Sequence, residues 1–274
     1  MTRDATYDIG RRGLLATLAA AGLMPLTARA QMQGQDSAPA TGSSAAAIIG
    51  GPSEILISYR CDSANRPAFR RYLANEMMAR LKALQARGTL KSYQILFNPF
   101  VSETWDAMVL LSFHTYADTQ AWKIVERSMP GGLDAAGLKL GHPIQTYNCD
   151  LEWQGWAADP GPEHQRVAYA IPYSYNALGQ YKTYVDAYVI PQVKGWIDDG
   201  ALSGYRFYLN RYQTGDPWDC LFIYDYRNLE QFGRRDEVVA KVRATLQSNA
   251  EWVHLNEIKA TIRSESENTI ADIL

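Results

Sequence analysis

The sequence has little cysteine and no large excess of positive or negative charge. Both features exclude some classes of function. Three of its 274 residues are cysteines (Cys61, Cys149 and Cys220), so at most one disulfide can form within the chain. None has the C-x-x-C or Cys/His spacing of a metal site, so no metal is predicted. Cys149 and Cys220 lie in apolar stretches that predict buried free thiols. A formal net charge of −2 excludes a strongly basic nucleic-acid binder.

The sequence also lacks the short motifs of several large enzyme classes. It contains no P-loop, no G-x-G-x-x-G, no G-x-S-x-G and no H-E-x-x-H, so no nucleotide, hydrolase or zinc-protease site is predicted from a motif. A hydrophobic content of 47% nevertheless excludes a disordered chain and supplies ample apolar material for a core.

The first 30 residues have the features of a cleaved export signal. Arg11 and Arg12 precede an apolar run at 14–24, and residues 28–30 (Ala-Arg-Ala) have the form of a cleavage site. The run is too short to predict a stable membrane span after cleavage. The segment GRRGLLA resembles the twin-arginine export motif, while its leucine in place of the usual phenylalanine leaves general secretory export as an alternative. We predict a periplasmic or secreted bacterial protein with a flexible leader at 31–53.

The chain repeats itself at an offset of 112 residues. The segment GTLKSYQILFN at 88–98 aligns with GALSGYRFYLN at 200–210. Upstream, the strand-like residues 55–59 align with 167–171 at the same offset. A similarity that keeps its register over this length predicts two copies of one structural unit.

Each copy predicts the element order strand, helix, strand, strand, helix, strand. Apolar residues recur at helical spacing in the first helix of each copy, and Gly88 and Gly200 stand where a left-handed residue ends a helix. The last strands are predicted at 144–153 and 252–263. The predicted division is a first repeat at 54–156, a linker at 157–165, a second repeat at 166–263 and a C-terminal tail at 264–274.

A βαββαβ unit of about 100 residues is the ferredoxin-like fold, whose sheet carries helices on one face only. The predicted fold class is therefore α+β, with two tandem ferredoxin-like repeats packed sheet to sheet as an intrachain dimeric α+β barrel. Over residues 55–263, this order and duplication resemble the dimeric α+β-barrel superfamily in its fused, two-repeat form. That superfamily includes cofactor-free monooxygenases, small isomerases, stress proteins and haem enzymes such as chlorite dismutases and dye-decolourising peroxidases.

Tyrosine is concentrated in the second copy, where 11 of the 17 tyrosines lie between Tyr169 and Tyr226. Tyrosine joins a large apolar ring to a hydroxyl group and therefore suits a pocket for an apolar or aromatic ligand. Tyr173, Tyr208 and Tyr226 are the candidate ligand contacts. The alternative is that these side chains fill the space between the two sheets.

Duplication also places polar residues at equivalent positions. Asn98 matches Asn210, and Asp106 matches Asp219. These residues either satisfy backbone groups in the hairpins or, if they lie inside, orient a ligand. Asp225 has no acidic counterpart, since a serine stands opposite it, and it is a candidate catalytic base.

His142 and His254 are the candidate catalytic histidines, because both are predicted near the ends of equivalent strands. Either would act as a base or, in a haem enzyme, as the axial ligand, and the alternative is an ordinary surface or core histidine. The segment GGLDA at 131–135 resembles the GxxDG motif of dye-decolourising peroxidases, which implies Asp134 as the distal acid. Ala135 departs from that motif, and a plain helix break accounts for the run equally well.

Three hypotheses for the function follow. The first is an exported α+β barrel that binds a small apolar or aromatic molecule, with a cofactor-independent oxygenase or isomerase activity as its enzymatic form. The second is a non-catalytic binding or stress protein of the same fold. The third is a haem-binding, peroxidase-like protein. No cofactor is the main expectation, and a homo-oligomer is compatible with all three.

Overall fold

The computed structural model describes residues 53–212 and 218–274. The predicted export signal, and the predicted leader apart from its last residue, lie outside the described residues. Within these residues, no helix is both long and apolar enough to cross a membrane.

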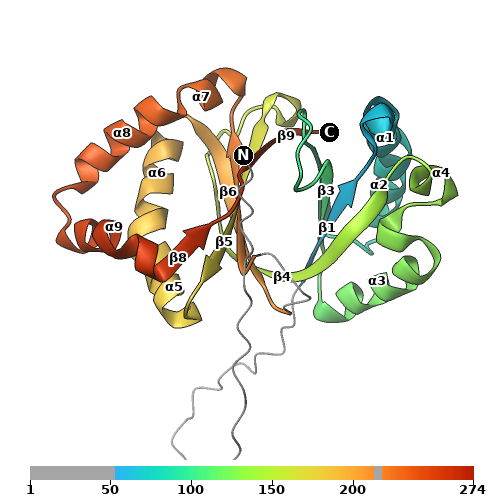
Figure 1. Ribbon diagram of the computed structural model, residues 1–274, viewed down its shortest axis with the longest axis horizontal. Coiled ribbons are helices and arrows are strands. Elements are labelled where there is room, and N and C mark those ends of the chain that lie inside the picture. The colour runs from blue at the N-terminus through green and yellow to red at the C-terminus, as the bar shows by residue number, and fades with distance from the viewer. Residues whose placement is uncertain (1–52, 213–217) are drawn as a thin grey trace, which may run out of the picture. The chain divides into compact units, whose positions relative to one another are not determined.

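In the described part of the chain, eight antiparallel strands close into a β-barrel (Figure 1). Their order around the barrel is β7-β6-β4-β1-β3-β2-β9-β5, and β5 pairs with β7 to complete the ring. A short additional strand, β8 (Arg263–Glu265), pairs with β5 outside the ring. The barrel strands are β1 (Glu54–Arg60), β2 (Ser92–Phe97), β3 (Ala107–Ser112), β4 (His142–Trp156), β5 (Val167–Tyr175), β6 (Leu202–Asn210), β7 (Cys220–Tyr226) and β9 (Thr269–Ile273).

Helices cover the barrel on two sides, α1–α4 on one side and α5–α9 on the other (Figure 1). The first long helix combines α1 (Arg66–Tyr72) and α2 (Met78–Ala86), and the second combines α5 (Leu178–Tyr184) and α6 (Ile190–Asp198). The other helices are α3 (Tyr116–Ser128), α4 (Ala135–Leu138), α7 (Leu229–Gly233), α8 (Arg235–Leu246) and α9 (Ala250–Ile262).

The two long helices match turn for turn at an offset of 112 residues. Each is interrupted by a five-residue π turn, at Leu73–Met77 in the first and Val185–Val189 in the second. Pro191 follows the second π turn, but an alanine holds the matching place in the first helix, so proline is not the cause of the π turn. Gly88 and Gly200 follow the helices with φ values of 72° and 86°, which confirms both predicted ends.

The predicted last strand at 252–263 is wrong, because this segment forms helix α9. Trp252, Leu255 and Ile262 are its buried residues and lie on one face at helical spacing. The Asn249 side chain caps the helix by accepting a hydrogen bond from the Trp252 backbone N–H at 3.1 Å. The strand that closes the second half is β9, within the predicted C-terminal tail, and it pairs with both β2 and β5.

The two halves join edge to edge, which corrects the expected packing of one sheet face on another. β4 pairs with β6 and β2 pairs with β9, so both junctions link a strand of the first half to one of the second. One face of the closed sheet therefore lines a shared interior, and the other packs against helices. Leu56 and Cys149 lie in the interior core, and Ile57 and Cys220 in the helix-facing cores. Both cysteines are buried and free, as predicted.

The repeated Asn and Asp residues hold two hairpins in the same way. The backbone N–H of Asn98 donates to the carbonyl of Asp106 at 2.9 Å, and Asn210 donates to Asp219 at 2.9 Å. The Asp106 carboxylate accepts a backbone N–H just after β1 at 2.8 Å, and the Asp219 carboxylate accepts one within β5 at 3.1 Å. The Asn98 side chain accepts a hydrogen bond from the Phe100 backbone N–H at 2.9 Å, and the Asn210 side chain donates one to the Trp218 backbone carbonyl at 3.5 Å. This geometry corresponds to the structural alternative, in which these side chains satisfy backbone groups.

Asp106→Ala is expected to lower the free energy of unfolding by about 3 kcal/mol, as measured by urea denaturation. Asp106 is buried and accepts a hydrogen bond from the buried guanidinium of Arg66, so its removal leaves a buried charge without its acidic partner. Asp118→Ala, which removes the capping box at the exposed start of α3, is the control and should cost about 1 kcal/mol. Equal losses in the two variants would contradict this account of the hairpin.

Candidate functional site

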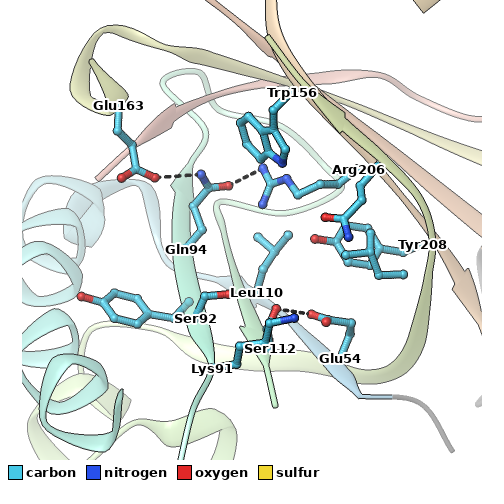
Figure 2. Close-up of a pocket in the computed structure, with 13 residues that line it drawn as sticks. Glu54, Lys91, Ser92, Gln94, Leu110, Ser112, Trp156, Glu163, Arg206 and Tyr208 are labelled. Carbon is cyan, nitrogen blue, oxygen red and sulfur yellow. Dashed lines mark hydrogen bonds between the residues drawn. The ribbon is translucent and has the colours of Figure 1, made fainter. Parts of the chain in front are cut away.

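A cavity of about 260 Å³ lies at the end of the barrel where β1 begins and β3 ends (Figure 2). We call it the polar pocket. Charged, amide and hydroxyl side chains line most of it, whereas the middle of the barrel is filled by apolar side chains. The residues that define its chemistry are Glu54, Gln94, Ser112, Trp156, Arg206 and Tyr208.

Strand alternation explains why a glutamate is buried here. Leu56 on β1 belongs to the interior core, while Ile55 and Ile57 belong to the helix-facing core. Glu54 is two residues from Leu56 and shares its face, so closure of the barrel carries the carboxyl group inside. Only 4% of Glu54 remains exposed. A carboxyl group buried to this extent needs polar partners or takes up a proton.

Glu54 has a hydroxyl group as its direct partner. Ser112 Oγ donates to Glu54 Oε2 at 2.6 Å (Figure 2). Burial raises the pKa of Glu54 from 4.5 to about 7, while Ser112 and the charges of Lys91 and Arg206 lower it by smaller amounts. Near neutral pH both the protonated and the ionised form of this carboxyl group are therefore populated. A group in that state can both accept and donate a proton during a reaction.

Arg206 is held in place by a chain of polar contacts inside the barrel. Its Nη2 donates to Gln94 Oε1 at 2.6 Å and to both carboxylate oxygens of Asp225 at 3.0 Å. Gln94 Nε2 in turn donates to Glu163 Oε1 at 3.2 Å (Figure 2). Arg166 Nη1 lies 4.0 Å from the fully buried Asp225 carboxylate. The Arg206 guanidinium therefore has a fixed position on the wall of the polar pocket.

One donor of Arg206 is unused. Its Nε is buried and has no hydrogen-bond partner among the described residues. The Trp156 ring lies over the guanidinium groups of Arg206 and Arg166, with ring-centre distances of 5.7 and 5.5 Å. Gly204 permits this approach, because a Cβ there would overlap the Trp156 ring.

Tyr208 completes the wall of the polar pocket beside Arg206. It lies two residues further along β6, on the same face and almost fully buried. Burial raises the pKa of its hydroxyl group above the usual value, although the Arg206 charge lowers it in part. The hydroxyl group therefore stays protonated at physiological pH and is available as a hydrogen-bond donor.

The polar pocket uses matching positions of the two halves, but the residues at those positions differ. The first half contributes a glutamate, a glutamine and a serine to its lining, and the second half contributes Arg206, with a second arginine and an aspartate next to Arg206 behind the wall. Two of the pairs are 112 positions apart, and the third is 113 apart. The pairs are Glu54 and Arg166, Gln94 and Arg206, and Ser112 and Asp225.

The structure brings together two of the predicted site residues and separates the others. Asp225 and Tyr208 both lie inside the barrel near Arg206. Tyr173 and Tyr226 lie on the opposite face of the sheet, in the helix-facing core of the second half. They line a small cavity of about 90 Å³ in that tyrosine-rich core. The alternative prediction, that tyrosines fill the space between two facing sheets, is therefore wrong for Tyr173 and Tyr226.

The predicted histidines lie at the surface. His142 is the first residue of β4, and His254 lies on the exposed side of α9 rather than in a strand. The chain's other two histidines, His114 and His164, are exposed as well. A haem iron needs an axial ligand within an enclosed cavity, most often a histidine. The histidines of this chain do not fit that role.

Asp134 also departs from the role that its motif implies. It begins α4 by accepting hydrogen bonds from the backbone N–H groups of Ala136 at 3.0 Å and Gly137 at 2.9 Å. Tyr72 Oη donates to it at 2.9 Å, and Arg80 forms an ion pair with it. The Gly137 hydrogen bond is the main reason why its pKa falls to about 2. Asp134 therefore acts as a helix cap, as the helix-break alternative expects.

Sequence reasoning does not identify Glu54, Gln94 or Arg206. Each is a polar residue within an otherwise apolar strand, and strands of this kind admit polar side chains inward only where a partner satisfies them. A position-by-position comparison of the two halves, searching for polar residues within apolar strands, would find these three residues. Without the knowledge of which face lies inside, however, that signal does not separate them from surface residues.

Comparisons with known proteins define the fold. Neither a protein-family model nor a curated protein matches the sequence. Among solved structures, the chain is similar to a proposed monooxygenase from Lactobacillus acidophilus NCFM, with 10% identity and a TM-score of 0.53 over 81% of this chain and 94% of that one. An anthrone oxidase-like protein is similar with 6% identity and a TM-score of 0.50, over 81% and 90%. A haem-binding protein from Thermus thermophilus has 13% identity and a TM-score of 0.48, over 82% and 91%.

These likenesses show the fold alone. The neighbours are dimeric α+β-barrel proteins, and the described chain has their closed barrel with outer helices. At identities of 6–13%, neither an activity nor a haem site carries over to this chain.

Glu54→Gln is expected to abolish one part of the pH dependence of stability. The pKa of Glu54 is about 7 in the folded chain and close to 4.5 in the unfolded chain, so the folded state binds more protons between these values. Stability therefore falls as the pH rises from about 4.5 to 7, by up to about 3 kcal/mol. The glutamine variant should lack this loss.

Urea denaturation of both proteins at pH 4.5 and pH 8 measures the difference. Relative to the parent protein, the glutamine variant should gain about 3 kcal/mol in free energy of unfolding between the two pH values. The exposed Glu251→Gln on α9 is the charge-matched control and should follow the parent. If all three proteins have the same pH profile, Glu54 does not carry the raised pKa.

Proposed function

We propose that this chain is an exported α+β-barrel protein that binds a small molecule in the polar pocket, where Glu54 transfers a proton. One observation carries the proposal. A buried carboxyl group, with a serine hydroxyl as its direct partner, lines the same cavity as a fixed guanidinium and a buried tyrosine hydroxyl. A base beside hydrogen-bond donors is the arrangement that proton abstraction next to a carbonyl group or on a phenol needs.

The proposed reaction needs only groups of this chain. Ionised Glu54 removes a proton from the substrate, and the negative charge that develops on the substrate oxygen is stabilised by Arg206 and Tyr208. Return of the proton from Glu54 to another atom of the same molecule gives an isomerisation, with no net change in atoms or electrons. Tyr93, Leu110 and Leu151 provide apolar surface for the body of an apolar or aromatic substrate.

Asp225 takes part through Arg206 in this scheme. Its buried carboxylate is paired with Arg206 through both oxygens and has Arg166 nearby, so it balances the buried positive charge. Asp225 is therefore a positioning residue, and Glu54 takes the role of base that the sequence suggests for Asp225. His142 and His254 have no part in the proposed reaction.

We also propose that the chain consists of two copies of one ferredoxin-like unit. The two long helices, their π turns, the glycines that end them and the two hairpins recur at offsets of 112–114 residues. These matches support two fused ferredoxin-like repeats, with the second extended to β9. Because the barrel closes within one chain, a homo-oligomer would add to it rather than complete it.

A non-catalytic binding protein is the second candidate. The observation that favours it is the extent of internal pairing, because Gln94, Asp225 and Glu163 use their polar atoms on one another or on Arg206. Such a protein would bind ligand in the polar pocket and leave it unchanged. The two candidates differ in whether Glu54 exchanges protons with a bound ligand.

Deuterium exchange measured by NMR separates the two candidates. The purified protein, incubated in D₂O with a panel of enolisable aromatic ketones, should speed the incorporation of deuterium next to the carbonyl group of at least one ketone. Glu54→Gln should slow that exchange by at least 100-fold, the usual contribution of a positioned base. The rate should rise with pH through about 7, because only ionised Glu54 accepts a proton.

Glu251→Gln is the matched control, since it removes an exposed carboxylate on α9. It should exchange at the parent rate. Ketone affinity in Glu54→Gln, measured by NMR titration, should stay within about threefold of the parent. Exchange that is unchanged in Glu54→Gln would contradict proton transfer by this residue, and binding without exchange in the parent protein would favour the second candidate.

The export proposal has a separate test. Replacing both arginines of the twin-arginine-like motif, as Arg11→Lys with Arg12→Lys, should keep the chain unprocessed inside the cell. Mass spectrometry of periplasmic and cytoplasmic fractions measures this, because the processed parent protein should begin at Gln31. Normal processing of the double variant would instead indicate the general secretory route.

A further inference from the structure

A second and larger cavity lies at the opposite end of the barrel. It encloses about 400 Å³, and we call it the aromatic pocket. Ser58, four residues after Glu54 on β1, lines it, so the two pockets lie at different ends of the same strand. Met108 and Leu221 form part of its apolar lining.

Three aromatic side chains line this pocket. Trp105 and Trp218 precede β3 and β7, at matching hairpins of the two halves, and Tyr147 comes from β4. The rings of Tyr147 and Trp218 are 4.6 Å apart, with 37° between their planes. All three side chains are largely buried, so their ring positions are fixed by packing. Aromatic faces are electron-rich and attract cations.

The charges at the pocket have one sign. Glu103 and Glu267 lie at its exposed rim, and among the described residues neither a lysine nor an arginine nor a histidine lines it. Arg60 donates a hydrogen bond to the backbone carbonyl of Glu103. The carboxylate that pairs with Arg60 is that of Asp106, at 3.9 Å. The two rim carboxylates therefore give the pocket a negative potential that is not balanced within its lining.

We propose that the aromatic pocket binds an organic cation with an apolar body, such as a quaternary or protonated amine. Its aromatic faces would contact the cationic head, the rim carboxylates would attract it, and Met108 and Leu221 would contact the apolar part. An anionic ligand would be repelled by the rim, and a neutral one would gain nothing from it. This site does not depend on the proposed function of the polar pocket.

Isothermal titration with benzyltrimethylammonium and with its neutral isostere neopentylbenzene tests the proposal. The two probes have the same shape and differ in charge. The purified protein should bind the cation about tenfold more tightly than the neutral isostere. Raising the salt concentration should lower the affinity for the cation, because the rim carboxylates are exposed to solvent and their charges are screened. The affinity for the neutral probe should not change.

Two variants test whether the cation binds in the aromatic pocket. The double variant Glu103→Gln with Glu267→Gln should bind the cation about three- to tenfold more weakly than the parent does. Its affinity for neopentylbenzene should stay within twofold of the parent's. Trp105→Phe keeps an apolar ring at the wall and should weaken the cation by a few fold, since indole is the best cation-binding ring. The double variant Glu251→Gln with Glu257→Gln, both exposed on α9, is the charge-matched control and should bind as the parent does.

Three results would overturn the proposal. The cation could fail to bind, the neutral isostere could bind as tightly as the cation, or the double variant could bind the cation as tightly as the parent. An unchanged thermal midpoint in each variant ensures that a loss of binding does not reflect a loss of fold.

Discussion

Closure of the sheet into a barrel decides the environment of every strand residue. Because β4 pairs with β6 and β2 pairs with β9, alternate side chains of all eight strands point either into one interior or toward a helix layer. The interior of such a barrel is just filled by side chains, so it leaves room for cavities mainly at its two ends. The polar pocket and the aromatic pocket occupy those ends.

The two ends differ because the two halves of the chain differ. Matching chain positions near the polar pocket carry Glu54 in one half and Arg166, just before β5, in the other, and Gln94 faces Arg206. Charges of both signs thereby meet inside the barrel, and Arg206 is neutralised by Asp225 while Glu54 has a serine hydroxyl as its direct partner. Burial, which Ser112 and the nearby positive charges offset only in part, raises the pKa of Glu54. At the other end, both halves contribute a hairpin tryptophan and the rim is acidic.

Much of the fold could be predicted from the sequence, and its site mostly could not. Offset matches such as Gly88 with Gly200 reflect local backbone requirements that a sequence records directly. The sequence of α9 predicts a strand because its short apolar run suits either period, and this wrong prediction leaves β9 in the predicted C-terminal tail. The sequence indicates Asp225 and Tyr208 but not Glu54, because strand alternation reveals two faces without revealing which one the barrel encloses.

Closure of the barrel places the carboxyl group of Glu54, whose pKa is raised to about 7, beside fixed hydrogen-bond donors. Carbon-13 NMR of the protein labelled at glutamate side-chain carboxyl groups, with Glu54 assigned by its loss in Glu54→Gln, follows this group directly over pH 3–9. The account predicts a titration midpoint near pH 7 for Glu54. A midpoint near the ordinary value of 4.5 would contradict it.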